Sequence, residues 1–136
     1  MNSIGATVIL VQVGQIAPLG REGVPSGFIK RPVTGAVMIE KLGLVGDQQA
    51  ALRVHGGPYR AVYCYPVEHY AQWRTALPSA ASLLVPGGFG ENVTTQGLDE
   101  DQVCVGDVVR TGGVTAQVTQ PRRPCFKLGL RSRTHR

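Results

Sequence analysis

The sequence has few cysteines, and their spacing excludes the common disulfide and zinc patterns. Cys64, Cys104 and Cys125 lie far apart and form no CxxC pair in the 136 residues. An odd, sparse set of this kind argues against a disulfide framework and for a reducing compartment. No stretch approaches the roughly 18–20 continuous apolar residues of a membrane span, and the N-terminus lacks the basic start of a signal peptide. We therefore expect a cytoplasmic protein with no membrane segment.

Glycine and proline are abundant instead. The chain has 18 glycines and 9 prolines, and its hydrophobic fraction of 43% is ordinary for a folded protein. This composition favours many tight turns between short strands over a helical bundle. The length fits one domain, which we expect to cover residues 1–136.

The hydrophobic patterns predict a mainly β fold. Runs rich in β-branched residues predict strands at 7–13, 33–40 and 60–65. Two further runs, 103–110 and 114–120, flank Thr-Gly-Gly and predict a hairpin, with glycine supplying the positive φ of the turn. Several short strands separated by turns are typical of a barrel or a sandwich.

One or two short helices are expected between these strands. Pro66 suits a first helical turn, and Tyr70, Trp73 and Leu77 follow at helical spacing before Pro78 ends the pattern. A short apolar patch at 80–85 predicts one more helical turn. The remaining apolar pattern places Cys64 and Cys104 in the core.

The segment QPRRPCFK, residues 120–127, is the strongest candidate for chemistry. Nearby guanidinium groups lower the pKa of a thiol, and a rigid thiolate is a soft metal ligand or a nucleophile. From these residues alone, a functional Cys125 and an inert buried cysteine both remain open. The net charge of +5 and the basic last fifteen residues favour an anionic partner, with a solvated tail as the alternative.

Three other segments could contact an anion or a heterocycle. His55, in RVHGGPYR, could donate to a phosphate, act as an acid or base, or be structural. The glycines of PGGFGEN could form an anion-binding nest or only a loop, and Asn92 after them could offer a donor and an acceptor. Lys30 and Arg31, in PSGFIKRPV, could bind phosphate or lie in a solvated loop.

Taken together, these segments resemble the MOSC superfamily, named for the C-terminal domain of molybdenum cofactor sulfurase. The similarity is to its stand-alone bacterial YiiM-like branch, which is associated with the reduction of N-hydroxylated bases. It rests on the order and spacing of three stretches: GLVGDQQAALRVHGGPYRAVYCYPVEHYAQWR, GGFGENVTTQGLDEDQVCVGDVVR and QVTQPRRPCFKL.

The resemblance implies a MOSC-type β-barrel that holds a molybdenum cofactor (molybdopterin) in a positively charged cleft. Cys125 matches the cysteine that supplies a thiolate to the metal in related members, and it would be both metal ligand and catalytic residue. The other positions matched to the cleft are Lys30, Arg53, His55, Asn92 and Arg122. Molybdenum bound by dithiolene sulfurs accepts another soft sulfur readily, which agrees with this assignment.

Stand-alone members of the family continue well beyond the PRxPC segment, with further strands and a C-terminal helical domain. We therefore expect a barrel truncated at the C-terminus, either as a fragment or as a short member completed by another chain. An unpaired barrel edge would promote association, so a homodimer is one expectation. Some residues of the cleft could then lie outside this chain.

The leading functional hypothesis is an oxidoreductase that reduces N-hydroxylated substrates such as N-hydroxylated purines. It would need a separate electron-donor protein, because no flavin, haem or iron–sulfur motif is present. The alternative is a non-catalytic carrier or sulfur-relay module for the cofactor. A second alternative is a basic β-barrel that binds RNA, which we do not favour because the few aromatic residues form no obvious stacking platform.

Overall fold

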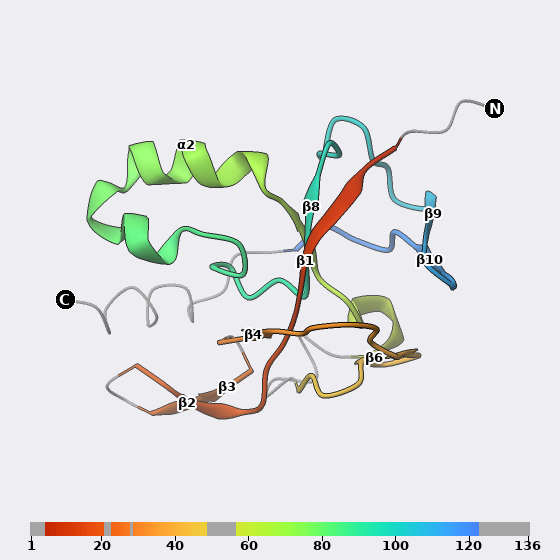
Figure 1. Cartoon of the computed structure of the whole chain (residues 1–136), viewed down its shortest axis with the longest axis horizontal. Coiled ribbons are helices and arrows are strands. Elements are labelled where there is room, and N and C mark those ends of the chain that lie inside the picture. The colour runs from red at the N-terminus through yellow and green to blue at the C-terminus, as the bar shows by residue number, and fades with distance from the viewer. Residues whose placement is uncertain (1–4, 21–22, 28, 49–56, 123–136) are drawn as a thin grey trace.

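The computed structural model describes residues 5–20, 23–27, 29–48 and 57–122, and a four-stranded sheet lies at its centre (Figure 1). Its strands are β1 (Thr7–Val13), β4 (Arg31–Pro32), β7 (Cys64–Pro66) and β8 (Val93–Gln96), in the order β4-β1-β8-β7. Strand β1 is antiparallel to both of its neighbours, whereas β7 runs parallel to β8. The predicted strand at 7–13 is confirmed, since its β-branched residues suit a pleated, half-buried surface.

Three two-stranded ribbons surround this sheet. They pair β2 (Ala17–Leu19) with β3 (Val24–Ser26), β5 (Ile39–Glu40) with β6 (Gly43–Leu44), and β9 (Val108–Thr111) with β10 (Val114–Gln117). The β9–β10 ribbon confirms the predicted hairpin, although both arms are shorter than expected. Its turn contains Gly112, at φ +55°, as the turn chemistry requires.

The described residues are mainly β with one short α-helix, as predicted, and no closed barrel is formed among them. Each of the three ribbons pairs only with itself, and the central sheet keeps two edges, β4 and β7. Both edge strands contain a proline, which lacks the N–H needed to continue a ladder. The predicted strand at 33–40 is also wrong over most of its length, because only Ile39–Glu40 is extended and Gly35 turns the chain at φ +80°.

The predicted helix is α2 (Glu68–Ala76), which is followed by a 3-10 segment, η2 (Pro78–Leu83). A second 3-10 turn, η1 (Pro58–Arg60), occupies the start of the region predicted as a strand at 60–65. Tyr70 is fully buried, whereas Trp73 is 42% exposed, so only part of the predicted apolar stripe faces the core. Among the described helices, none is long and apolar enough to cross a membrane.

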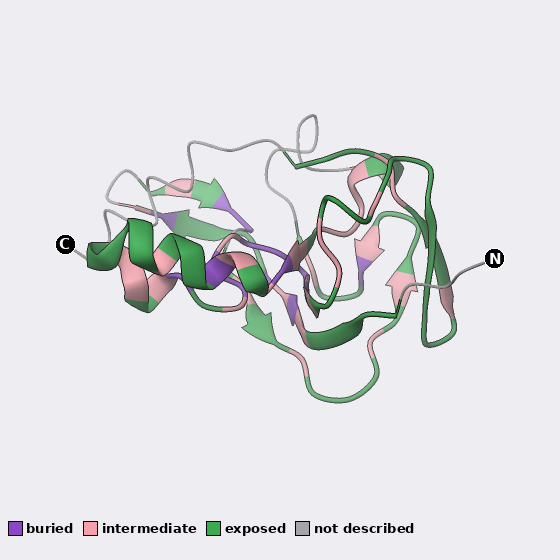
Figure 2. Ribbon diagram, turned by 90° about the horizontal axis from the view of Figure 1, so that it is seen from above, coloured by how far each residue is buried: buried purple, intermediate pink, exposed green. Residues whose placement is uncertain are grey.

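Among the described residues, polar side chains account for many of the buried ones. The buried apolar residues are Leu19, Leu44, Tyr70 and Leu84, and the buried polar ones are Gln12, Ser26, Glu91, Asn92 and Thr94. Figure 2 shows buried segments running through the middle of the molecule beside α2, while the hairpin side is largely exposed. The expectation that Cys64 and Cys104 belong to the core is wrong, since both are exposed. Cys64 lies on β7, an edge strand of the central sheet, and a local apolar pattern does not reveal that position.

Candidate functional site

Several backbone amides of the PGGFGEN loop, residues 86–92, have partners within the protein. Gly88 N–H donates to the Val85 carbonyl at 2.7 Å, and Gly90 N–H donates to the Gly87 carbonyl at 3.0 Å. The Phe89 N–H is 3.2 Å from the Glu91 carboxylate. These amides are therefore satisfied within the protein, and the structure favours the self-contained loop over the anion-binding nest.

The carboxylate that the Phe89 N–H contacts belongs to Glu91, which is completely buried. The Tyr70 hydroxyl, from α2, lies 2.7 Å from Oε1 and 2.5 Å from Oε2, and the Thr94 hydroxyl donates to Oε2 at 3.1 Å. Burial and the neighbouring Glu91 charge raise the pKa of Tyr70, so its hydroxyl stays protonated and remains a donor. The loop thus encloses an anion of its own, which joins it to α2 and to β8.

The double glycine of this loop is required by close packing. Gly87 has φ +88°, and a Cβ there would overlap the carboxamide of Gln12, which itself donates to the Pro86 carbonyl at 3.1 Å. A Cβ on Gly88 would overlap the Leu83 carbonyl and lie 2.8 Å from the Val85 carbonyl oxygen. Only glycine lets the backbone approach these groups.

Asn92, predicted to contact the cofactor, lies between two backbone segments. Its Oδ1 accepts from Tyr63 N–H at 3.0 Å, and its Nδ2 donates to the Gln12 carbonyl at 3.3 Å. The residue is 3% exposed. In the described structure, its side chain therefore joins β1 to the segment that precedes β7.

Lys30, also predicted to contact the cofactor, forms a buried ion pair. Its Nζ is 2.7 Å from Asp47 Oδ1 and 3.0 Å from the Gly27 carbonyl, and the two charged side chains are only 6% and 3% exposed. The same Asp47 oxygen accepts from Gly14 N–H at 2.9 Å, just after β1. The Lys30 charge is thus compensated by a carboxylate of this chain.

The segment that leads to Cys125 docks on residues 59–63. The hydroxyl of Thr119 donates to the Tyr59 carbonyl at 2.5 Å, and the Gln120 carboxamide donates to the same oxygen at 3.3 Å. Arg60 donates to Gln120 Oε1 at 3.2 Å. The Arg122 guanidinium carbon then lies 4.7 Å from the centroid of the Tyr63 ring, a cation–π geometry.

We call Gln12, Tyr63, Asn92 and Arg122 the Tyr63 junction. It joins β1, the segment before β7, the PGGFGEN loop and the segment before Cys125. Burial and the Glu91 charge raise the pKa of Tyr63, while the Arg122 guanidinium partly opposes that rise. The ring therefore remains a neutral tyrosine beside a fixed positive charge.

Of the six predicted site residues, the structure describes Lys30, Asn92 and Arg122, and it brings the last two together on Tyr63. Arg53, His55 and Cys125 lie outside the described residues. Glu91 was missed, since nothing in the local sequence shows that it meets Tyr70, 21 positions earlier.

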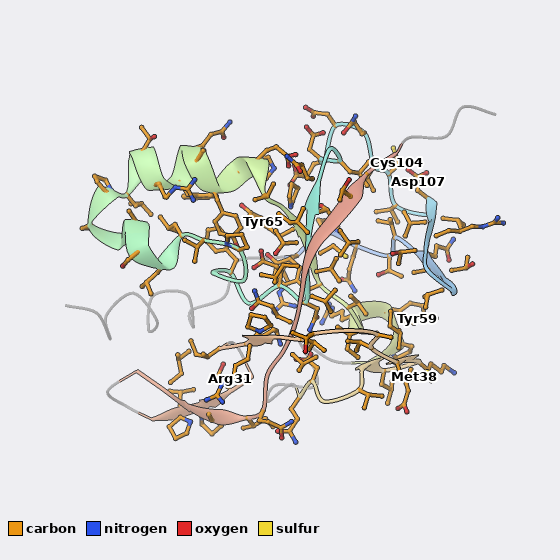
Figure 3. All side chains as sticks on the ribbon, viewed as in Figure 1. Arg31, Met38, Tyr59, Tyr65, Cys104 and Asp107 are labelled. Carbon is orange, nitrogen blue, oxygen red and sulfur yellow. The ribbon has the colours of Figure 1, made fainter. Side chains whose placement is uncertain are left out.

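Other parts of the described structure offer no competing site for a metal. Its residues contain no group of three or more His, Cys, Asp and Glu side chains arranged to hold a metal ion. A depression is lined by Glu40, Lys41, Leu42 and Pro58, none of which is a predicted site residue. Figure 3 shows Cys104 beside Asp107 and Arg31 toward the opposite end of β1, so neither is part of the junction.

Comparisons with known proteins agree with the resemblance seen in the sequence. The model of the MOSC domain family matches residues 51–136. Protein YiiM from Escherichia coli is 50% identical over 107 residues, which cover 79% of this chain and 48% of that protein. A protein named Reductase from Gibberella moniliformis is 37% identical over 127 residues, which cover 91% of this chain and 22% of that protein.

Solved structures show the same similarity. The crystal structure of YiiM from Escherichia coli matches 87% of this chain and 52% of its own, with a TM-score of 0.67 and 41% identity. That of YiiM from Geobacillus stearothermophilus matches 93% of this chain and 56% of its own, with a TM-score of 0.69 and 30% identity. The chain therefore spans about half the length of the YiiM structures it matches.

Proposed function

Because the chain belongs to the MOSC domain family, we propose that it binds a molybdenum cofactor through Cys125 and reduces N-hydroxylated compounds. The observation that carries this proposal is the Tyr63 junction, which fixes a guanidinium three residues before Cys125. The fungal relative named Reductase supports a reductive activity. N-hydroxylated purines are the substrates that we propose to test first.

The residues present suit this cofactor. A metal held by two dithiolene sulfurs needs a single protein thiolate, so a cluster of protein ligands is unnecessary. Arg122 lies three positions before Cys125 in the sequence, and its positive charge would favour a thiolate there and would also suit an anionic pterin phosphate. Arg53 and His55 stay predictions for the same phosphate or for the substrate.

The roles of the described residues follow from their contacts. Asn92 holds the backbone of Tyr63 against β1, and Tyr63 holds Arg122. Lys30 stabilises the turn after β1 through Asp47, so we assign it a supporting role in place of a phosphate contact. When bound, the cofactor supplies the two-electron chemistry, and a separate electron-donor protein must reduce it.

Elemental analysis of protein purified from a cofactor-producing host tests this proposal. We expect bound molybdenum in the wild-type chain and at least a roughly tenfold lower affinity in Cys125→Ser, since a lost ligand costs more than a lost supporting contact. Cys104→Ser is the matched control, because Cys104 is an exposed cysteine away from the junction. Its molybdenum content should equal that of the wild type.

Activity is then measured as reduction of N-hydroxylaminopurine or an amidoxime with an artificial electron donor. Turnover that depends on Cys125 supports the reductase. Stoichiometric molybdenum without turnover would indicate the carrier or sulfur-relay module. Equal molybdenum in the wild type and Cys125→Ser would rule out Cys125 as the metal ligand.

A further inference from the structure

We propose that the chain forms a homodimer in which β10 (Val114–Gln117) pairs antiparallel with β10 of a second copy. The pairing joins two β9–β10 hairpins into one four-stranded sheet, with Ala116 at the two-fold axis. The proposal goes beyond the proposed function and needs no cofactor, since the described residues 106–118 carry it.

Strand β10 differs in composition from the other edge strands of the described structure. Prolines occur in β2, β3, β4 and β7, and β5 and β6 have only two residues each. Strand β9 contains Arg110, whereas β10, with the sequence VTAQ, has neither a proline nor a charged side chain. Proline and charge are the features by which an edge strand resists pairing with another chain. Among the described edges, β10 is therefore the one best suited to such pairing.

The outer edge of β10 offers two donors and two acceptors. Val118 N–H donates to the Asp107 carbonyl at 2.8 Å, and hydrogen-bonded pairs alternate with non-hydrogen-bonded pairs along an antiparallel ladder. Ala116 is therefore bonded to β9, while the backbone N–H and C=O groups of Thr115 and Gln117 point away from it. Within the described part of the chain, no hydrogen bond from outside the hairpin reaches these four groups.

The space around the hairpin is open. A Cβ at Gly112 or Gly113 would meet nothing within 4 Å, and Val108, opposite Gln117, is 61% exposed. Figure 1 shows the hairpin on the other side of the central sheet from α2. A two-stranded hairpin with both faces in water is marginally stable, so further strands stabilise it.

One two-fold register satisfies all of the outward groups. With Ala116 opposite Ala116 of the second copy, Thr115 of each copy lies opposite Gln117 of the other, and the two pairs exchange four hydrogen bonds. The Ala116 pair is then of the non-hydrogen-bonded type, in which the Cα atoms approach to about 4.5 Å. The small side chain of alanine fits this close approach.

The same register extends an apolar face across the dimer. Val109 lies opposite Ala116 within the hairpin, so these residues and their copies form one row across four strands. On the same face, Val114 lies opposite Val118 of the second copy. An edge that complements itself in hydrogen bonds and in apolar contacts meets the requirement of an isologous dimer, so the second copy is the partner that we assign to it.

The first experiment is sedimentation equilibrium over a range of protein concentrations. Thr115→Pro removes an N–H that the hairpin does not use, and it should weaken the dimer at least about tenfold, because the two-fold axis applies the loss twice. Val108→Pro is the matched control, since it removes an outward N–H from β9 on the other edge of the hairpin. Its dimerisation constant should equal that of the wild type. A wild type that stays monomeric up to about 1 mM, or equal losses in the two variants, would overturn the proposal.

The second experiment is disulfide cross-linking, which does not depend on the proline variants. In a background in which Cys64, Cys104 and Cys125 are replaced by serine, Ala116→Cys places two thiols across the axis. Their Cα separation of about 4.5 Å lies within the range of a disulfide. Oxidised glutathione should therefore link the two chains.

Val109→Cys is the matched control for cross-linking. Val109 is 36% exposed, but its two copies are separated by three strand spacings, about 14 Å. It should form the covalent dimer at least about tenfold more slowly. Equal rates in the two cysteine variants would overturn the register. Neither experiment uses the cofactor, so absence of molybdenum would remove the proposed function and leave this test unaffected.

Discussion

Two turn-rich regions of this protein use similar residues for opposite purposes. The PGGFGEN loop is mostly buried and surrounds the carboxylate of Glu91. The second region, residues 99–117, includes the β9–β10 hairpin, in which nearly every strand residue is exposed. Both regions contain acidic residues and paired glycines, so composition alone does not distinguish them.

The difference lies in what surrounds the glycines. A Cβ at Gly88 would overlap backbone oxygens, whereas a Cβ at Gly113 would meet nothing within 4 Å. Glycine is thus needed for close approach in the loop, and the hairpin needs only the positive φ of Gly112. The glycines of a segment near a candidate site can therefore be required for close packing of the backbone and not for binding an anion.

The largest expected effect comes from filling the space at the double glycine. Gly88→Ala should lower the free energy of unfolding by about 3 kcal/mol, because backbone carbonyls cannot move aside as a flexible side chain can. The matched change Gly113→Ala should stay within about 0.5 kcal/mol. Urea denaturation of the two variants measures both values, and similar losses would show that packing does not distinguish the two regions.

A smaller effect is expected from the buried carboxylate. Tyr70→Phe removes the hydroxyl that donates to Glu91 and leaves a buried acceptor short of a partner, at a cost of about 1–3 kcal/mol. Tyr59→Phe removes a hydroxyl from a residue that is 71% exposed and should cost close to nothing. Thermal unfolding followed by circular dichroism compares the pair. A neutral Tyr70→Phe would mean that Glu91 does not depend on this donor.

The smallest effect concerns the exposed region and depends on pH. His69, on α2, lies 2.7 Å from Glu100, whose side chain is 67% exposed. Burial is the largest single effect and raises the pKa of Glu100, but the hydrogen bond from His69, a backbone hydrogen bond and the His69 charge together outweigh it, so the pKa lies below the usual 4.5. A lowered pKa in the folded state contributes stability above the unfolded-state pKa and loses it as the pH falls through the folded-state value.

Glu100→Gln should therefore be slightly less stable than the wild type at pH 6, by less than about 0.5 kcal/mol for an exposed pair. The difference should disappear as the pH falls from about 5 to about 3. Unfolding curves at several pH values measure it, with His69→Gln as the partner variant that should show the same loss. A difference that grows toward acid pH would reverse the assigned sign.

Local patterns predicted several elements well. The β-branched run at Thr7–Val13, the proline and aromatic spacing around α2 (Glu68–Ala76), and the Thr-Gly-Gly hairpin each depend on neighbouring residues. The described residues form no closed barrel, and the predicted burial of Cys64 is wrong, because both depend on which distant segments meet. Gly35, at φ +80°, also interrupts the strand that the apolar pattern predicted over residues 33–40.

The candidate site divides in the same way. The sequence by itself determined the family, through the order of the HGGP, FGEN and PRRPC segments, and it identified Cys125 as the proposed thiolate. Only the tertiary structure decided that Lys30 pairs with Asp47, that Asn92 joins two backbones, and that Arg122 lies on Tyr63. The reason is physical. A motif consists of residues that are contiguous in the sequence, whereas the partner of a charge or an amide depends on how distant segments pack, here segments 17 to 80 positions apart.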